Sequence, residues 1–114
     1  MILYGIPNCD TIRKARHWLD DHHLDYQFHD YRKQGISKSL LQGWIKKADW
    51  ESLINRRGTT WRKLPESMRE RINPSSAIEL MLEQPTLIKR PVLVTDNDLL
   101  IGFDEQNYRQ LLKK

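Results

Sequence analysis

The sequence predicts an α/β (α+β) fold in which a strand–helix–strand unit, a helical segment and a strand–strand–helix unit follow one another. Three observations indicate this order. Apolar runs of strand length lie near both ends of the chain, the residues between them repeat at helical spacing, and Gly, Pro, Asn and Asp separate the segments. We therefore expect a mixed four-stranded sheet flanked by helices.

The N-terminal segment predicts a strand followed directly by a helix. Residues 1–4 are apolar and bulky, a break follows, and Ile12, Ala15 and Leu19 then share one side at helical spacing. Cys9, the only cysteine, therefore stands where a strand ends and a helix begins.

A second strand is expected over residues 24–29, where Leu24, Tyr26 and Phe28 alternate on one face. Strand, helix and strand within about thirty residues form a βαβ unit, so the first two strands should be parallel.

The middle of the chain, residues 36–84, is expected to be a helical insertion. Signals for helix starts recur along it, each followed by apolar residues at helical spacing. These signals are Ser37, Asp49, Pro65 and the capping-box pair Ser76 and Glu79, and Pro85 should end the last helix.

The C-terminal part returns to strands. Pro91 precedes the β-branched run 92–94, an Asp-Asn-Asp turn follows, and residues 99–101 complete an antiparallel hairpin. Asp104 can cap a final helix. Without the middle helices this is the order of a thioredoxin-like domain, although periodicity alone leaves several α+β arrangements open.

Length and composition favour a single domain over residues 1–114, and nothing requires more than a monomer. The chain has 39% hydrophobic residues, enough for one core. The net charge of +4 would suit a small anion or an acidic peptide and only weakly suggests nucleic acid, which we do not expect as a partner. No apolar run is long enough for a membrane helix or a secretory signal. One cysteine cannot form an internal disulfide, so we expect a cytoplasmic protein.

Cys9 is the candidate reactive residue. The unpaired N–H groups and the dipole of a helix start stabilise a thiolate, and Arg13 and Lys14 could add to this effect. The alternative is a buried cysteine that acts as a small hydrophobe, but the polar neighbours of Cys9 favour the reactive interpretation.

The partner thiol of Cys9 must come from another molecule. Ile12 stands where a Cys-x-x-Cys motif would place the second cysteine, so glutathione is the expected co-substrate, with no bound cofactor. The four histidines show no spacing typical of metal ligands, so no metal site is expected.

Two basic segments are further candidates. Residues 56–63 gather Arg, Lys and Thr around a glycine, which indicates an oxyanion or carboxylate site or, equally, an exposed loop anchored by Trp61. Residues 89–91 end in Pro91, for which an ordinary trans bond at a strand start is the default because only about 5–6% of such bonds are cis.

Five segments together resemble the ArsC family, most closely its YffB branch, with Spx as a sister branch. They are residues 4–15, 29–32, 57–64, 89–91 and 102–103. The resemblance implies a thioredoxin-like sheet with a helical insertion. It also implies that Cys9 is the nucleophile, that Pro91 is a cis-proline, and that Arg57 and Arg90, with Asn8 and Thr11, bind an anion or stabilise the thiolate.

Three departures from the family narrow the function that the resemblance implies. Arsenate reductases carry a histidine in the loop before the cysteine, where this chain has residues 4–7, and a further arginine where Gly102 falls. Spx-type regulators often carry a Cys-x-x-Cys switch, which Ile12 removes. The resemblance thus implies a glutathione-dependent thiol reductase. The alternatives are an Spx-like regulator that binds a protein such as RNA polymerase, and an arsenate reductase with a weakened oxyanion site.

Overall fold

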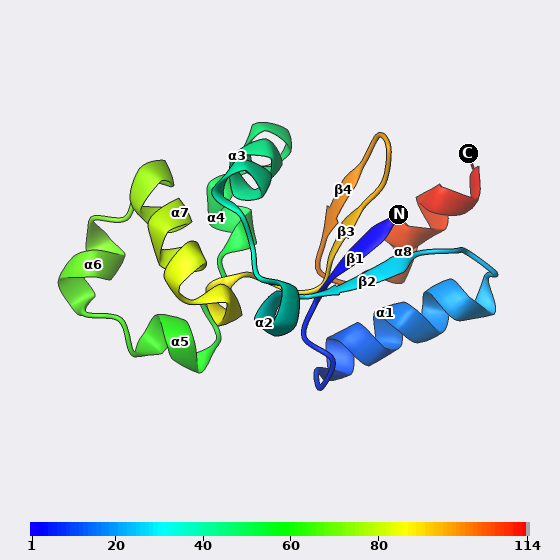
Figure 1. Ribbon diagram of the computed structural model, residues 1–114, viewed down its shortest axis with the longest axis horizontal. Helices are drawn as coiled ribbons and strands as arrows, with labels where there is room; N and C mark the ends of the chain where they lie inside the picture. Colours follow the sequence, from blue (N-terminus) through cyan, green and yellow to red (C-terminus); the bar gives the residue numbers. More distant parts are fainter. Residues whose placement is uncertain (114) are drawn as a thin grey trace. The chain divides into compact units, whose positions relative to one another are not determined.

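The computed structural model describes residues 1–113, which fall into two compact units (Figure 1). Met1–Gln34 and Arg90–Lys114 form the first, here called the sheet unit, and Gly35–Lys89 form the second, the helical unit. That residues 1–114 act as a single domain stays a prediction.

The sheet unit contains the predicted mixed four-stranded sheet. Its strands are β1 (Ile2–Gly5), β2 (Gln27–Asp30), β3 (Val92–Val94) and β4 (Leu99–Ile101), in the order β2-β1-β3-β4. β1 pairs with β2 in parallel and with β3 in antiparallel fashion, and β3 and β4 form the expected hairpin. The α/β fold class predicted from the sequence is confirmed.

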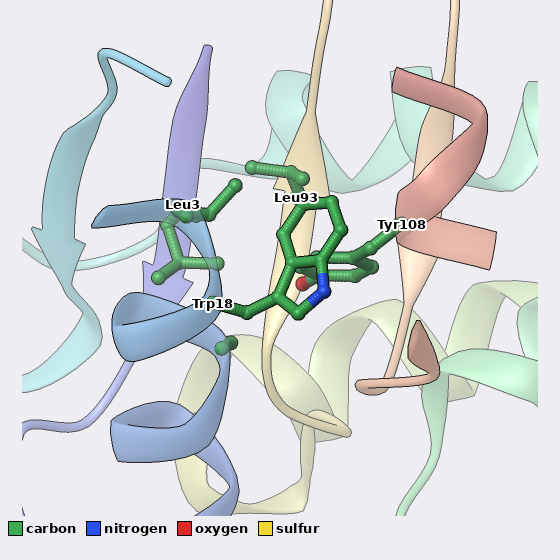
Figure 2. Packing of buried hydrophobic residues seen from close by; sticks show 6 residues of the cluster. Leu3, Trp18, Leu93 and Tyr108 are labelled. Atoms are coloured by element: carbon green, nitrogen blue, oxygen red, sulfur yellow. The ribbon is translucent and has the colours of Figure 1, made fainter. Parts of the chain in front are cut away.

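One face of this sheet is covered by α1 (Asp10–Asp21) and α8 (Glu105–Arg109). Leu3 and Leu93 are direct partners on β1 and β3, and Trp18 and Tyr108 close over them (Figure 2). The Trp18 and Tyr108 rings meet edge to face with centroids 5.5 Å apart. Asp104 caps α8 as predicted, because its side chain accepts a hydrogen bond from the Gln106 N–H.

The second strand starts three residues later than predicted, at Gln27 rather than Leu24. The Leu24 N–H still donates to the carbonyl of Leu19 at the end of α1, and the sheet ladder begins with the Gln27 N–H on the carbonyl of Met1. Leu24, Tyr26 and Phe28 nevertheless pack against the same core, which explains their alternation.

The helical unit contains short helices joined by tight turns. They are α3 (Lys38–Lys47), α4 (Trp50–Leu53), α5 (Thr59–Arg62), α6 (Glu66–Glu70) and α7 (Pro74–Glu83), followed by the 3₁₀ turn η1 (Pro85–Leu87). α3 packs against α7, and Lys38 pairs with Glu79 across them at 3.6 Å. None of the described helices has the length and apolar character needed to cross a membrane.

The predicted caps of this unit are partly wrong. Ser37 caps α3 as expected. The capping box of α7 is formed by Asn73 and Ser76, not by Ser76 and Glu79, because the helix already begins at Pro74. Asp49 occupies the N-cap position of α4, but its side chain makes no capping hydrogen bond.

Candidate active site around Cys9

Three chain segments meet at one edge of the sheet. β1 and β2 are parallel and end there, and β3 is antiparallel to β1 and starts there. Cys9 follows β1, the short helix α2 (Tyr31–Gln34) follows β2, and Arg90 precedes β3. The fold thus gathers residues that are far apart in the sequence.

Cys9 is the N-cap residue of α1 and has an extended backbone, with φ −117° and ψ 132°. Its carbonyl accepts the first bond of the helix, from the Arg13 N–H at 3.0 Å. The thiol is free and half-buried. It makes no full capping hydrogen bond, but the N–H dipoles of Ile12 and Thr11 are close enough to favour a charged sulfur.

Arg90 reaches the same sulfur from the start of β3. Its side chain forms a hydrogen bond to Cys9 and adds the attraction of its positive charge. The next peptide bond, Arg90–Pro91, is cis, and Pro91 is buried. The low frequency of cis-proline predicted a trans bond before Pro91, and this prediction is wrong.

These groups have opposing effects on the thiol. Partial burial of the sulfur raises the pKa of Cys9, and this is the largest single effect. The Ile12 N–H, the Arg90 hydrogen bond, the Thr11 N–H and the Arg90 charge act together in the other direction. The outcome is a Cys9 pKa below its ordinary value, so a larger share of the sulfur is thiolate at neutral pH.

Arg13 and Lys14, which could have added to this effect, are not among the groups that lower the Cys9 pKa. Arg13 points to solvent with 65% of its side chain exposed and pairs with Asp10 at 3.3 Å. Lys14 is exposed as well. The guanidinium that acts on the sulfur comes from β3 rather than from the helix itself.

Gly5 makes room for this arrangement. A Cβ atom placed there would overlap Cδ1 of Ile12 and would lie 3.9 Å from Cβ of Arg90. Ile12 is fully buried and supplies one of the N–H groups that act on the sulfur. Glycine at this position lets Ile12 of α1 come close to the end of β1, a role that was not predicted from the sequence.

An aromatic layer lies at the same edge of the sheet and was also missed. The Tyr4 ring stacks on Tyr31 with centroids 6.4 Å apart and planes at 7°, and meets His29 edge to face at 4.7 Å. Asp30 fixes the start of α2, because its carboxylate accepts from the Arg32 N–H at 2.8 Å. The sequence offered only the motif at residues 29–32 as a signal.

The remaining predicted site residues lie in different places. Thr11 is half-buried and contributes its backbone N–H, whereas Asn8 is exposed in the loop before Cys9. Arg57 belongs to the helical unit, where its N–H donates to Oδ1 of Asn55 at 3.2 Å and its side chain is exposed. Its approach to the sulfur stays a prediction.

Arg57 also lines a cavity of about 480 Å³ within the helical unit, together with Asn55, Arg56 and Lys89. Arg56 pairs with Glu51 at 3.8 Å and stands over the Trp61 ring at 5.4 Å. Trp61 is half-buried, so it is covered partly by Arg56 rather than sunk in the core. Among residues 1–113, no cluster of His, Cys, Asp and Glu is arranged to hold a metal ion.

The sequence profile of the ArsC family matches residues 4–111. The chain belongs to the ArsC family. An uncharacterized protein of Haemophilus influenzae is 42% identical over 107 residues, which are 94% of each chain. The global transcriptional regulator Spx of Streptococcus pyogenes is 30% identical over 98% of this chain and 84% of its own length.

Solved structures of the family agree with the fold. A YffB protein is 47% identical, covers 96% of both chains and has a TM-score of 0.92. An arsenate reductase-related protein of Brucella melitensis is 50% identical, covers 99% of this chain and 94% of its own, and has a TM-score of 0.79. The relatives of this chain thus include both an arsenate reductase-related protein and Spx regulators.

Proposed function

We propose that this ArsC-family protein is a cytoplasmic thiol–disulfide oxidoreductase in which Cys9 is the only nucleophile and glutathione is the co-substrate. One observation carries the proposal: the Cys9 sulfur lies among the N–H groups of a helix start and the Arg90 guanidinium, all of which favour the thiolate. A thiolate is the attacking species in disulfide exchange, and a low thiol pKa also makes a better leaving group.

The proposed reaction has two exchange steps. The Cys9 thiolate attacks the glutathione sulfur of a mixed disulfide, forms a Cys9–glutathione disulfide and releases the substrate as a thiolate that takes a proton from water. A second glutathione, as thiolate, then attacks the glutathione sulfur of this intermediate. Cys9 leaves as the free thiolate, and the substrate thiol has been freed. The glutathionyl group of the substrate and the incoming glutathione have together become glutathione disulfide.

The side chains around Cys9 support an external thiol as the second reactant. Ile12, at the position of a resolving cysteine, is fully buried and carries no sulfur. We expect Arg90 to hold a carboxylate of glutathione once the sulfur is engaged, with Asn8, Thr11 and Arg57 contributing further polar contacts.

Replacement of the nucleophile tests the proposal. Turnover of a glutathionylated peptide is measured with glutathione, glutathione reductase and NADPH. Cys9→Ser should abolish turnover and leave the far-UV circular dichroism spectrum unchanged, because Cys9 is only half-buried and serine is of similar size. Turnover that persists in this variant would remove Cys9 from the mechanism.

A regulatory role is the second candidate, favoured by the 30% identity to Spx of Streptococcus pyogenes. In that case the fold would bind a protein partner such as RNA polymerase, and the cysteine would be incidental. A stoichiometric partner that Cys9→Ser retains, combined with no thiol turnover by the wild type, would favour this role. Against it stands Ile12, which rules out a Cys-x-x-Cys switch.

Arsenate reduction is expected to be weak. Gly102 has a φ of +78°, and its N–H donates to the Pro91 carbonyl at 2.8 Å. Glycine favours this left-handed backbone, and the position supplies no guanidinium for an oxyanion. A glutathione-coupled assay with arsenate tests this expectation directly.

A further inference from the structure

The cavity in the helical unit carries charged side chains that the protein itself does not pair. Its volume of about 480 Å³ lies within the range of about 300–1,000 Å³ that is typical of small-molecule sites. Arg56 and Glu51 on its wall pair with each other at 3.8 Å. Arg57, Lys89 and Asp49 line the same cavity and are exposed, and within residues 1–113 none of their side chains makes an ion pair or a hydrogen bond.

The backbone fixes the segments that carry these charges. Ile54 and Ile88 are buried and form an antiparallel bridge, so Lys89 follows directly on a segment that is held in place. The side chain of Asn55 fixes the turn on the other side of the bridge, because its Oδ1 accepts a hydrogen bond from the Arg57 N–H at 3.2 Å. The cavity wall is therefore formed before any ligand arrives, which lowers the entropic cost of binding.

The unpaired charges favour a ligand that bears both signs. Two cations and one carboxylate remain on the wall, so their net charge is positive. Basic and acidic residues are equal in number in the sheet unit, so the entire net charge of +4 lies in the helical unit. A simple anion would pair with the cations but would be repelled by Asp49. A ligand with two carboxylates and one ammonium group matches all three side chains.

We propose that this cavity binds a small zwitterionic diacid, in which Arg57 and Lys89 pair with the two carboxylates and Asp49 pairs with the ammonium group. Guanidinium and ammonium groups both bind carboxylates by charge-assisted hydrogen bonds. Free glutamate and the γ-glutamyl tripeptide glutathione both carry the required groups. The inference goes beyond the proposed function, because it involves no thiol chemistry at Cys9.

A chemical-shift titration of the nitrogen-15-labelled full chain tests the proposal. The probes are L-glutamate and S-methylglutathione, which both have two carboxylates and one ammonium group and lack a thiol. At constant pH and ionic strength, at least one of them should produce saturable shifts of the amide resonances of residues 49–57 and 89. The probe that binds more tightly identifies an amino acid or a peptide as the ligand. If neither probe shifts these amides in a saturable way, the inference is wrong.

Single charge removals test the role of each side chain. Lys89→Met should weaken binding of the tighter probe about fivefold, the upper value for an exposed ion pair. Asp49→Asn should weaken it to a similar extent, but it should not weaken binding of the N-acetylated form of the same probe, which has lost the ammonium group. Lys63→Met is the matched control, because Lys63 is an exposed cation of the same unit that is not among the lining residues. Its dissociation constant should equal that of the wild type.

These comparisons distinguish a site from a general attraction to positive charge. Because the substituted side chains are exposed, the amide resonances far from the cavity should stay in place and verify that each variant is folded. Equal weakening in Lys63→Met and Lys89→Met would show that only the overall charge of the helical unit matters, and would overturn the inference. Tighter binding of the unmodified probe by Asp49→Asn would overturn it as well, since Asp49 would then repel the ligand.

Discussion

The side chain of Arg90 donates a hydrogen bond to the sulfur of Cys9, although the two residues lie in different thirds of the sequence. The antiparallel pairing of β1 with β3 brings them together, because the end of one strand meets the start of the other. The reactivity of the thiol therefore depends on a completed sheet and not on the helix start alone.

Replacement of this arginine should make the thiol less acidic. Arg90 lowers the Cys9 pKa through both its hydrogen bond and its charge. In Arg90→Met the pH at which iodoacetamide reacts at half its maximal rate should move upward, and the reaction at neutral pH should slow. Arg13→Met is the matched control, because the exposed Arg13 guanidinium pairs with Asp10 and not with the sulfur. Its removal should leave the pH profile of the iodoacetamide reaction unchanged. Equal profiles for wild type and Arg90→Met would contradict the assignment.

The same shift predicts how stability depends on pH. Because the Cys9 pKa is lower in the folded state than its ordinary value of 9.0, the unfolded chain binds more protons between the two values. The free energy of unfolding of the wild type should therefore rise with pH across this window relative to Cys9→Ser, and this contribution is lost as the pH falls through the folded-state pKa. Urea unfolding of both proteins at several pH values measures the difference. If the stability of the wild type relative to Cys9→Ser fell as the pH rose, the folded-state pKa of Cys9 would not be lowered as described.

Two glycines should respond in opposite directions to alanine. Gly5→Ala would force the new methyl group against Ile12 and should cost about 1–3 kcal/mol, with a rise in the Cys9 pKa as the start of α1 shifts. Gly43 lies exposed within α3 with no atom near its missing Cβ, so Gly43→Ala should stabilise the protein by about 0.5–1 kcal/mol. Denaturant unfolding tests both. If Gly5→Ala left the free energy of unfolding unchanged, the site would tolerate a larger separation between Ile12 and the end of β1.

The caps of the helical unit offer a second matched pair. Asn73→Ala removes the side chain that accepts from the Ser76 N–H and should cost about 1 kcal/mol. Asp49 also sits at an N-cap but makes no such bond, so Asp49→Ala should cost less. If both substitutions cost the same in urea unfolding, the capping box does not stabilise α7 as described.

Neighbouring arginines separate binding from stability in the helical unit. Arg57 is exposed in the cavity that it shares with Arg56, and Arg57→Met should weaken protection of Cys9 by sulfate if the family role of this residue holds. Arg56 covers Trp61 and pairs with Glu51, so Arg56→Met should instead cost about 0.5–1 kcal/mol of stability. Protection that is unaffected by Arg57→Met would exclude Arg57 from the site.

Periodicity and turn residues predicted most of the fold. The structure confirms the first helix, whose buried face carries Ile12, Ala15 and Leu19, and the hairpin strand at residues 99–101. Both were predictable because each pattern reflects a face that packs within its own segment of the chain. Helix starts were less predictable. Asp49 has the right residue type for a cap, yet only the backbone geometry decides whether its carboxylate reaches an N–H group.

The surroundings of Cys9 were predictable only in part. The position of a cysteine at a helix start is visible in the sequence, and so is the expectation of a thiolate. Strand pairing across the sheet decides which other residues surround Cys9, and no local pattern encodes that pairing. It places Gly5 and Tyr31 at the same end of the sheet. It also explains why Arg90, and not Arg13, acts on the sulfur. The family resemblance, and not any local pattern, supplied Arg90.

The sheet unit is built from two stretches of chain that are separated by the whole helical unit. During synthesis Cys9 leaves the ribosome before the helical unit, and Arg90 follows only after the helices have been made. Until then Arg90 cannot lower the pKa of the Cys9 thiol. A chain that ends within residues 35–89 would keep its cysteine but lack the Arg90 guanidinium, so the full acidity of the thiol requires the segment that follows the helical unit.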